Sequence, residues 1–151
     1  MPQSSPRRTW VRRKACATDR AGGQCIRDDE LLTHHTKTRG HYDNGPRPQM
    51  EDETEVSVQR GKLTVAEASA LRNGGAPAHP VDVAAAGVRY TTAGKLREAG
   101  FAVIHTPGIK GEESGHGSVV WPDANPLDEQ DRAWPPGVQS TFAACFTEGE
   151  G

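Results

Sequence analysis

Two histidines and a serine in the second half of the chain are the residues whose types and spacing suggest catalysis. His105 ends an apolar run that starts at residue 101, and His116 begins a second such run. Imidazole has an ordinary pKa of about 6.5, so two neighbouring imidazoles can act as general base and general acid at neutral pH. Together with Ser118, they make the 105–118 hairpin the candidate site of a small His-dependent hydrolase or nuclease.

The segment between the two histidines, 106–115, is rich in glycine and charge. Its glycine amides and Lys110 suit an anion such as a phosphodiester, because successive backbone N–H groups in a loop form concave anion sites. The alternative is structural, since a histidine where a strand enters a loop often only faces water. We favour this alternative, in which the side chains of His105 and His116 both reach solvent and the hairpin has no chemical role.

The N-terminal third of the chain carries most of its basic charge. Through Pro48 there are ten Lys or Arg residues against five Asp or Glu, and from Gln49 on there are eight against fifteen. A basic arm on an acidic body suits nucleic acid, or else it folds back on its own domain. The residues expected to bind in the first case are Arg7, Arg8, Arg12, Arg13 and Lys14.

Potential metal ligands cluster upstream of the hairpin, at Cys16, Cys25, His34, His35 and His41. A zinc site needs four convergent ligands, and the spacing of these residues matches no compact zinc motif. Adjacent histidines also point apart in a strand. The loop 108–117 lacks the Lys-Ser/Thr ending of a nucleotide-binding loop. We therefore predict neither a metal nor a cofactor.

The cysteines and the hydropathy bear on location. Three cysteines cannot all pair within one chain, no apolar signal segment precedes them, and no run approaches the roughly 18 apolar residues of a membrane span. These features predict a reduced, cytoplasmic protein with no membrane partner. Cys145 falls on an apolar helical stripe, where a cysteine is more often a small buried hydrophobe than a nucleophile. The abundance of Ala, Gly, Arg and Pro favours a bacterial source.

Large apolar residues are unevenly distributed along the chain. Of the 23 Leu, Ile, Val and Phe residues, four lie in residues 1–53 and the other 19 lie in 54–146. A segment that cannot bury apolar surface does not offset its loss of conformational entropy on folding. We therefore expect a basic, largely disordered or loosely docked arm over 1–50, a single small domain over 51–147 and an acidic tail over 148–151.

Periodicity within the expected domain predicts both strands and helices. Strands are expected at 54–59, 101–106 and 117–122, from alternation and β-branched content. Helices are expected at 64–73, 91–99 and from Pro135 onward. The first has a capping box, Thr64 with Glu67, and the last has an apolar stripe centred on Phe142.

Two segments have ambiguous patterns. Residues 28–35 are interpreted as a short helical piece capped by Asp28 or Asp29. Residues 81–88 are interpreted as a short strand or extended segment, with a short helix that begins at Pro80 as the alternative.

The predicted fold class is α+β, with a small mixed sheet of three to four strands and about three helices behind the basic arm. The predicted function is that of a small soluble bacterial binding or accessory protein that engages a protein or nucleic-acid partner, because no catalytic constellation is complete. The His-dependent hydrolase at the 105–118 hairpin is the alternative. The sequence indicates no oligomeric state.

Overall fold

The computed structural model describes residues 25–45, 55–105, 115–121 and 134–148 of the chain. The first strand, β1 (Leu31–Thr36), lies near the middle of a sheet of six strands in the order β4-β5-β2-β1-β3-β6. The other strands are β2 (Glu55–Arg60), β3 (Gly87–Thr92), β4 (Ala102–His105), β5 (His116–Val120) and β6 (Thr147–Glu148). Every described pairing is antiparallel, so the expected mixed sheet of three to four strands is wrong in both respects.

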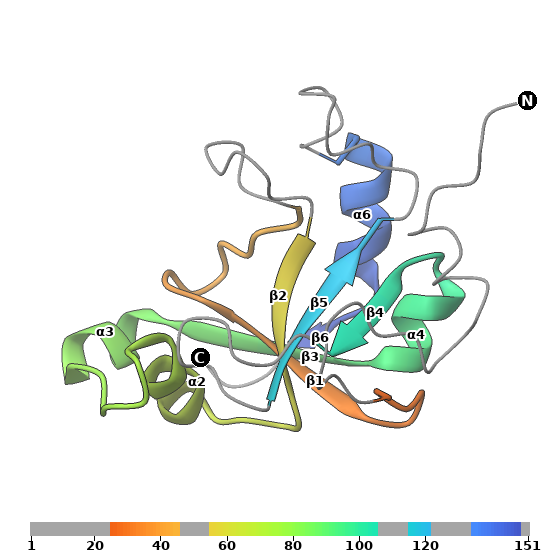
Figure 1. Cartoon of the computed structure of the whole chain (residues 1–151). Helices are drawn as coiled ribbons and strands as arrows, with labels where there is room; N and C mark the ends of the chain where they lie inside the picture. The colour runs from red at the N-terminus through yellow and green to blue at the C-terminus, as the bar shows by residue number, and fades with distance from the viewer. Residues whose placement is uncertain (1–24, 46–54, 106–114, 122–133, 149–151) are drawn as a thin grey trace, which may run out of the picture.

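The sheet has two antiparallel parts that meet at a short ladder. Only two residue pairs, Leu32–Arg60 and Thr33–Gln59, join β1 to β2, whereas six pairs join β1 to β3 and five join β2 to β5. Figure 1 shows β1 and β2 diverging on both sides of this contact. The part formed by β4, β5 and β2 therefore turns away from the part formed by β1, β3 and β6.

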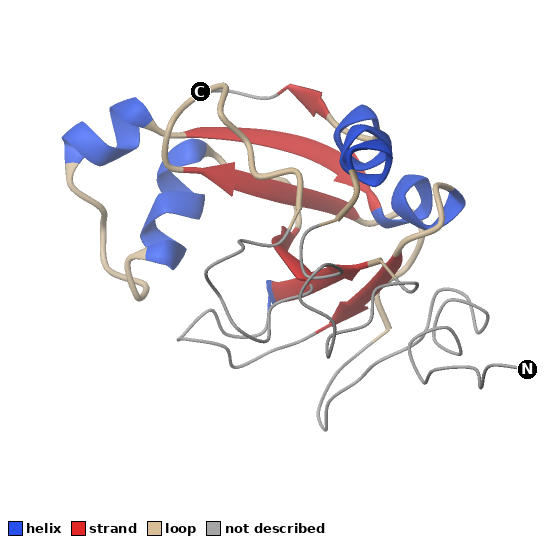
Figure 2. Ribbon diagram, turned by 90° about the horizontal axis from the view of Figure 1, so that it is seen from above, coloured by secondary structure: helices blue, strands red, loops and turns tan. Residues whose placement is uncertain are grey.

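Four helices lie within the described residues, in two pairs. They are α2 (Val65–Arg72), α3 (Pro80–Ala85), α4 (Ala93–Glu98) and α6 (Pro136–Ala144). Figures 1 and 2 show α2 beside α3 on one side of the molecule, and α4 and α6 on the other. The main core includes Leu96 of α4 and Phe142 of α6, and a separate cluster joins Ala68 of α2 to Val88 and Tyr90 of β3. The two helix pairs thus cover opposite faces of the sheet.

Most of the local expectations are confirmed. The capping box of α2 is present, because Thr64 Oγ1 accepts from the Glu67 amide at 3.1 Å and Glu67 Oε1 accepts from the Thr64 amide at 2.9 Å. Thr92 caps α4, and Gly100 follows this helix with φ +103°, a value that favours glycine. The expected strands at 101–106 and 117–122 correspond to β4 and β5.

Two segments differ from the expectation. Residues 28–35 are no helix, because Asp28 and Asp29 lie in a tight turn whose Glu30 amide donates to Arg27 O at 3.1 Å, and β1 follows directly. Residues 80–85 form a helix, α3, whose N-cap is His79 and whose first turn contains Pro80. The helix was the alternative. The interpretation of 81–88 as extended is correct only at residues 87 and 88, where β3 begins.

The sheet includes a strand, β1, that lies before the domain boundary expected near residue 50. Strand β1 pairs with β2 and β3, and Leu32 and Ile26 are fully buried in the main core. Two apolar side chains therefore suffice to dock this segment, because β1 obtains its other contacts from backbone ladders on both edges. Residues 1–24, the rest of the expected arm, lie outside the described residues.

Phe142 lies at the centre of an aromatic cluster in the main core. Its ring centroid is 5.3 Å from that of Trp134, 5.6 Å from Phe101 and 4.9 Å from Phe146, all near edge-to-face. The side chain is completely buried. Edge-to-face packing adds to the free energy gained from burial alone, so α6 is fixed to the sheet chiefly through this ring.

A buried arginine extends this cluster to β3 and β1. The guanidinium of Arg89 lies 4.4 Å from the ring centroids of both Tyr42 and Phe146. Its Nε donates to His34 Nδ1 at 3.0 Å, and its Nη2 donates to Asn44 Oδ1 at 2.9 Å. Because Nδ1 accepts this hydrogen bond, the His34 ring is neutral with its proton on Nε2.

Phe142→Ala is expected to lower the free energy of unfolding by about 3 kcal/mol or more, the usual cost of removing a fully buried aromatic ring. Urea unfolding followed by circular dichroism measures this change. Ser140→Ala, an exposed position on the same helix, is the matched control and should leave the midpoint unchanged. Equal midpoints for wild type and Phe142→Ala would show that α6 does not stabilise the core.

Candidate functional site

The histidines of the 105–118 hairpin point to opposite faces of the sheet. His105 pairs with Gly117 across the β4–β5 ladder and shares its face with Val103. His116 precedes Gly117, so it lies on the other face with Ser118. Both imidazoles are buried, at 2% and 1% exposure, contrary to the expectation that they reach solvent. They face inward because each belongs to a strand rather than to the loop that follows or precedes it.

The register brings His116 and Ser118 together but leaves His105 apart from both. The paired-imidazole arrangement, in which two rings on one face share a water or anion, is therefore not what the β4–β5 ladder provides. The other predicted binding residues lie outside the described residues: Lys110, Arg7, Arg8, Arg12, Arg13 and Lys14.

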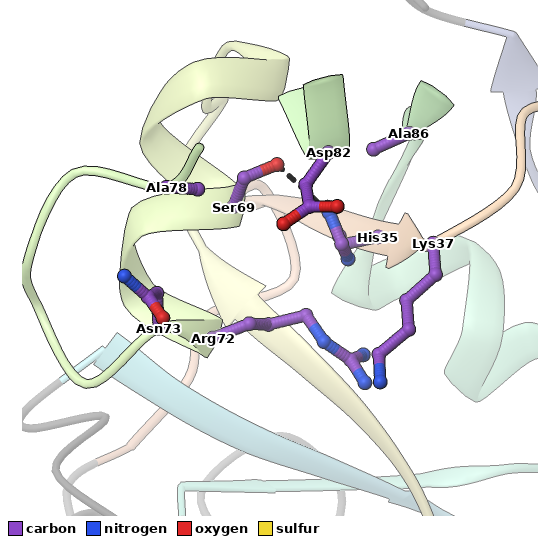
Figure 3. Close-up of a pocket in the computed structure, with 8 residues that line it drawn as sticks. All are labelled: His35, Lys37, Ser69, Arg72, Asn73, Ala78, Asp82 and Ala86. Carbon is purple, nitrogen blue, oxygen red and sulfur yellow. Dashed lines mark hydrogen bonds between the residues drawn. The ribbon is translucent and has the colours of Figure 1, made fainter. Parts of the chain in front are cut away.

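A pocket of about 280 Å³ lies on the face covered by α2 and α3. We call it the α2–α3 pocket. It is lined by His35, Lys37, Ser69, Arg72, Asn73, Ala78, Asp82 and Ala86 (Figure 3). These residues come from β1, from α2 and its C-terminal turn, and from the segment that contains α3. The volume lies just below the usual range for sites that enclose a drug-sized ligand, so it suits a small ligand or part of a larger one.

His35 is the residue of this pocket that sequence alone brought forward. The alternation of β1 places His34 in the main core and His35 on the opposite face. Its Nε2 lies 3.1 Å from Ser69 Oγ, at hydrogen-bond distance. Its other nitrogen, Nδ1, is buried and has no hydrogen-bond partner. A buried polar atom without a partner is costly, which marks Nδ1 as a position where a ligand atom would be stabilised.

Two cations lie beside His35. Lys37 is two residues farther along the chain, and Arg72 is in the last turn of α2. Figure 3 shows their charged ends pointing toward one another. Within the described ranges, neither cation forms an ion pair with a carboxylate, Asp82 of the same pocket included. Like charges that face each other without a counterion repel, and a bound anion would remove that repulsion.

The pKa of His35 is far below its ordinary value. Burial first, and then the charges of Arg72 and Lys37, lower this pKa to about 4. The free pocket therefore contains a neutral imidazole at pH 7. An imidazole with so low a pKa is a weak general base, so the His35–Ser69 pair is better suited to hydrogen bonding than to activating a nucleophile.

The sequence analysis missed five polar residues of the pocket: Lys37, Ser69, Arg72, Asn73 and Asp82. The sequence of α2 contained one signal that could have indicated Ser69 and Arg72. These residues follow Val65 at i+4 and i+7, so all three lie on one face of the helix. Ser69 is buried, unlike most polar residues of a surface helix. Asp82 carried no signal, because its segment was interpreted as extended.

The structure describes two of the three cysteines, Cys25 and Cys145. Cys25 is disulfide-bonded, so the expectation that all three cysteines are reduced is wrong for this residue. Cys145 is a free, partly buried thiol, and burial raises its pKa.

Across the described part of the chain, no group of three or more His, Cys, Asp or Glu residues could hold a metal ion. None of the described helices is both long and apolar enough to cross a membrane.

A scan against protein-family models, a search of curated proteins and a search of solved structures each returned no match.

We expect the folded protein to lose stability in mild acid because of the two neighbouring histidines of β1, His34 and His35. Burial, followed by the charge of Arg89, lowers the pKa of His34 well below its ordinary value, and the pKa of His35 is lowered to about 4. The unfolded chain binds protons at both residues below about pH 6.5, whereas the folded chain does not. The free energy of unfolding should therefore decrease as the pH falls from 7.5 to 5.0.

Urea unfolding at several pH values measures this dependence. His34→Gln keeps an acceptor for Arg89 but does not titrate, so its stability should fall less steeply than that of wild type. A free energy of unfolding that is constant from pH 7.5 to 5.0 in wild type would contradict the buried, neutral state of His34.

Proposed function

We propose that this protein is a binding module that engages a protein or nucleic-acid partner by capturing an anionic group in the α2–α3 pocket. The observation that carries the proposal is the pair of facing cations, Lys37 and Arg72, beside a buried and unpartnered nitrogen of His35. Lys37 and Arg72 are exposed, so their mutual repulsion in the free protein is weak, but both charges are available to an anion. The arrangement is therefore better explained as a recognition site than as a means of stabilising the fold.

The size of the pocket supports recognition of one group of a larger partner. A volume of about 280 Å³ has room for an anionic group and the atoms that attach it to a larger partner. His35 lies in β1, Lys37 follows directly after β1, and Ser69 and Arg72 lie in α2. These two elements are packed into the domain by the Ala68 cluster and by the β1–β3 ladder. A site built on regular elements is held in its binding geometry before the partner arrives, which lowers the entropic cost of binding.

Catalysis is not part of this proposal. His105 and His116 lie on opposite faces of the sheet, and His35 has a pKa of about 4, which is far from the neutral range that suits a general base. We also leave out the expected cytoplasmic location, because Cys25 is disulfide-bonded and disulfides persist mainly in oxidising compartments.

The test compares pocket variants with a charge-matched control. Isothermal titration at low salt uses three anionic probes: a single-stranded DNA dodecamer, a Glu-rich peptide and inorganic phosphate. We expect at least one to bind, and Lys37→Ala and Arg72→Ala each to weaken its binding about tenfold, as for the loss of one charge-assisted contact. Lys95→Ala removes an exposed positive charge from α4, on the opposite side of the sheet, and should change nothing.

Two outcomes would overturn the proposal. One is that none of the probes binds. The other is that Lys95→Ala weakens binding as much as the pocket variants do, which would show a general effect of net charge.

A further inference from the structure

Building on the proposed function, we infer that the α2–α3 pocket recognises a phosphorylated serine or threonine side chain of a partner protein, and that His35 takes up a proton when the phosphate binds. The ligand oxygens would face Lys37 and Arg72, beside the ring of His35.

The charge of the pocket points to a phosphomonoester. Lys37 and Arg72 bring two positive charges to one pocket, with their charged ends toward one another. A phosphomonoester carries a charge of about −1.5 to −2 at pH 7, so it balances both cations. A carboxylate and an internal phosphodiester each carry a single negative charge, so one cation would be left without a counterion.

The charge of the surrounding body favours a protein partner over a nucleic acid. From Gln49 on, the chain has eight Lys or Arg residues against fifteen Asp or Glu. Asp82 adds a carboxylate at the α3 side of the pocket itself. A nucleic acid that bound through a terminal phosphate would bring a row of further phosphates against this acidic body. A phosphopeptide brings one phosphate and leaves the rest of the surface free of repulsion.

The surroundings of His35 explain why binding and protonation are coupled. The groups that face its ring are Ser69 and Arg72 from α2, Lys37 beyond the end of β1 and Asp82 from α3, while Val88 is its cross-strand neighbour on β3. In the free protein the two cations oppose a third positive charge on the ring. A bound dianion reverses the sign of the local field, which stabilises a positive charge on the ring. Nε2–H of the protonated ring donates to Ser69 Oγ.

Thermodynamic linkage between proton binding and ligand binding sets the direction in which pH changes the affinity for the ligand. If the ligand favours the protonated ring, lower pH must favour the ligand by the same coupling free energy. A phosphomonoester loses its second charge near pH 6, which would obscure the effect. Sulfate keeps both charges over this range and presents the same oxygens, so the proton coupling is measured with sulfate.

The first experiment measures partner class by fluorescence anisotropy with the full chain at constant low salt. The probes are a phosphoserine peptide, the same peptide with serine, the same peptide with glutamate, and a 5′-phosphorylated DNA dodecamer. We expect the phosphopeptide to bind at least tenfold more tightly than each of the others, and Arg72→Ala to abolish the preference. Tighter binding of the DNA or of the glutamate peptide, lost in Arg72→Ala, would overturn this inference and leave the proposed function standing. Failure of every probe would overturn both.

The second experiment measures sulfate binding between pH 7.5 and 5.5. The dissociation constant of wild type is expected to decrease about tenfold over this range, because up to one proton is taken up per sulfate bound. His35→Gln should bind sulfate with no such dependence, and His41→Gln, an exposed histidine outside the pocket, should behave as wild type does. The same pH dependence in His35→Gln, or none in wild type, would overturn the proton coupling.

Discussion

Strand β1 imposes the constraint on which the core and the pocket both depend. Because successive residues of a strand point to opposite faces, the adjacent pair His34 and His35 cannot serve one site. His34 accepts a hydrogen bond from Arg89 within the aromatic core, and His35 forms part of the α2–α3 pocket. The ladders to β2 and β3 hold β1 in this orientation from both edges. A slip of one residue would exchange the two rings and destroy both environments.

The cations on the two faces of the sheet have different surroundings. On the core face, Arg89 is stabilised by Tyr42, Phe146 and the neutral ring of His34, so a buried cation becomes part of the packing. On the other face, Lys37 and Arg72 remain without ion pairs among the described residues. Arg89 therefore stabilises the fold, whereas Lys37 and Arg72 are the cations that we propose bind an anion. This contrast is the physical basis for placing function on the α2–α3 side.

Local signals in the sequence were sufficient for those elements whose ends are encoded nearby, such as α2 with its Thr64 and Glu67 box and α4 with its Thr92 cap. They failed for β1, because Asp28 and Asp29 serve equally well in a turn and at a helix start, and the strand is fixed by distant partners. The pocket could not be predicted for the same reason. Its charged residues belong to segments joined only by the sheet, and Asp82 enters it only because residues 80–85 are helical.

The most direct test of this account is the titration of the His34 and His35 imidazoles by NMR, with and without phosphate. We expect His35 to titrate with a pKa of about 4 in the free protein and at clearly higher pH in saturating phosphate. His34 should stay neutral in both cases until the protein unfolds. A His35 pKa near its ordinary value of about 6.5, unchanged by phosphate, would contradict the account, because it would show that no unrelieved positive field exists in the pocket.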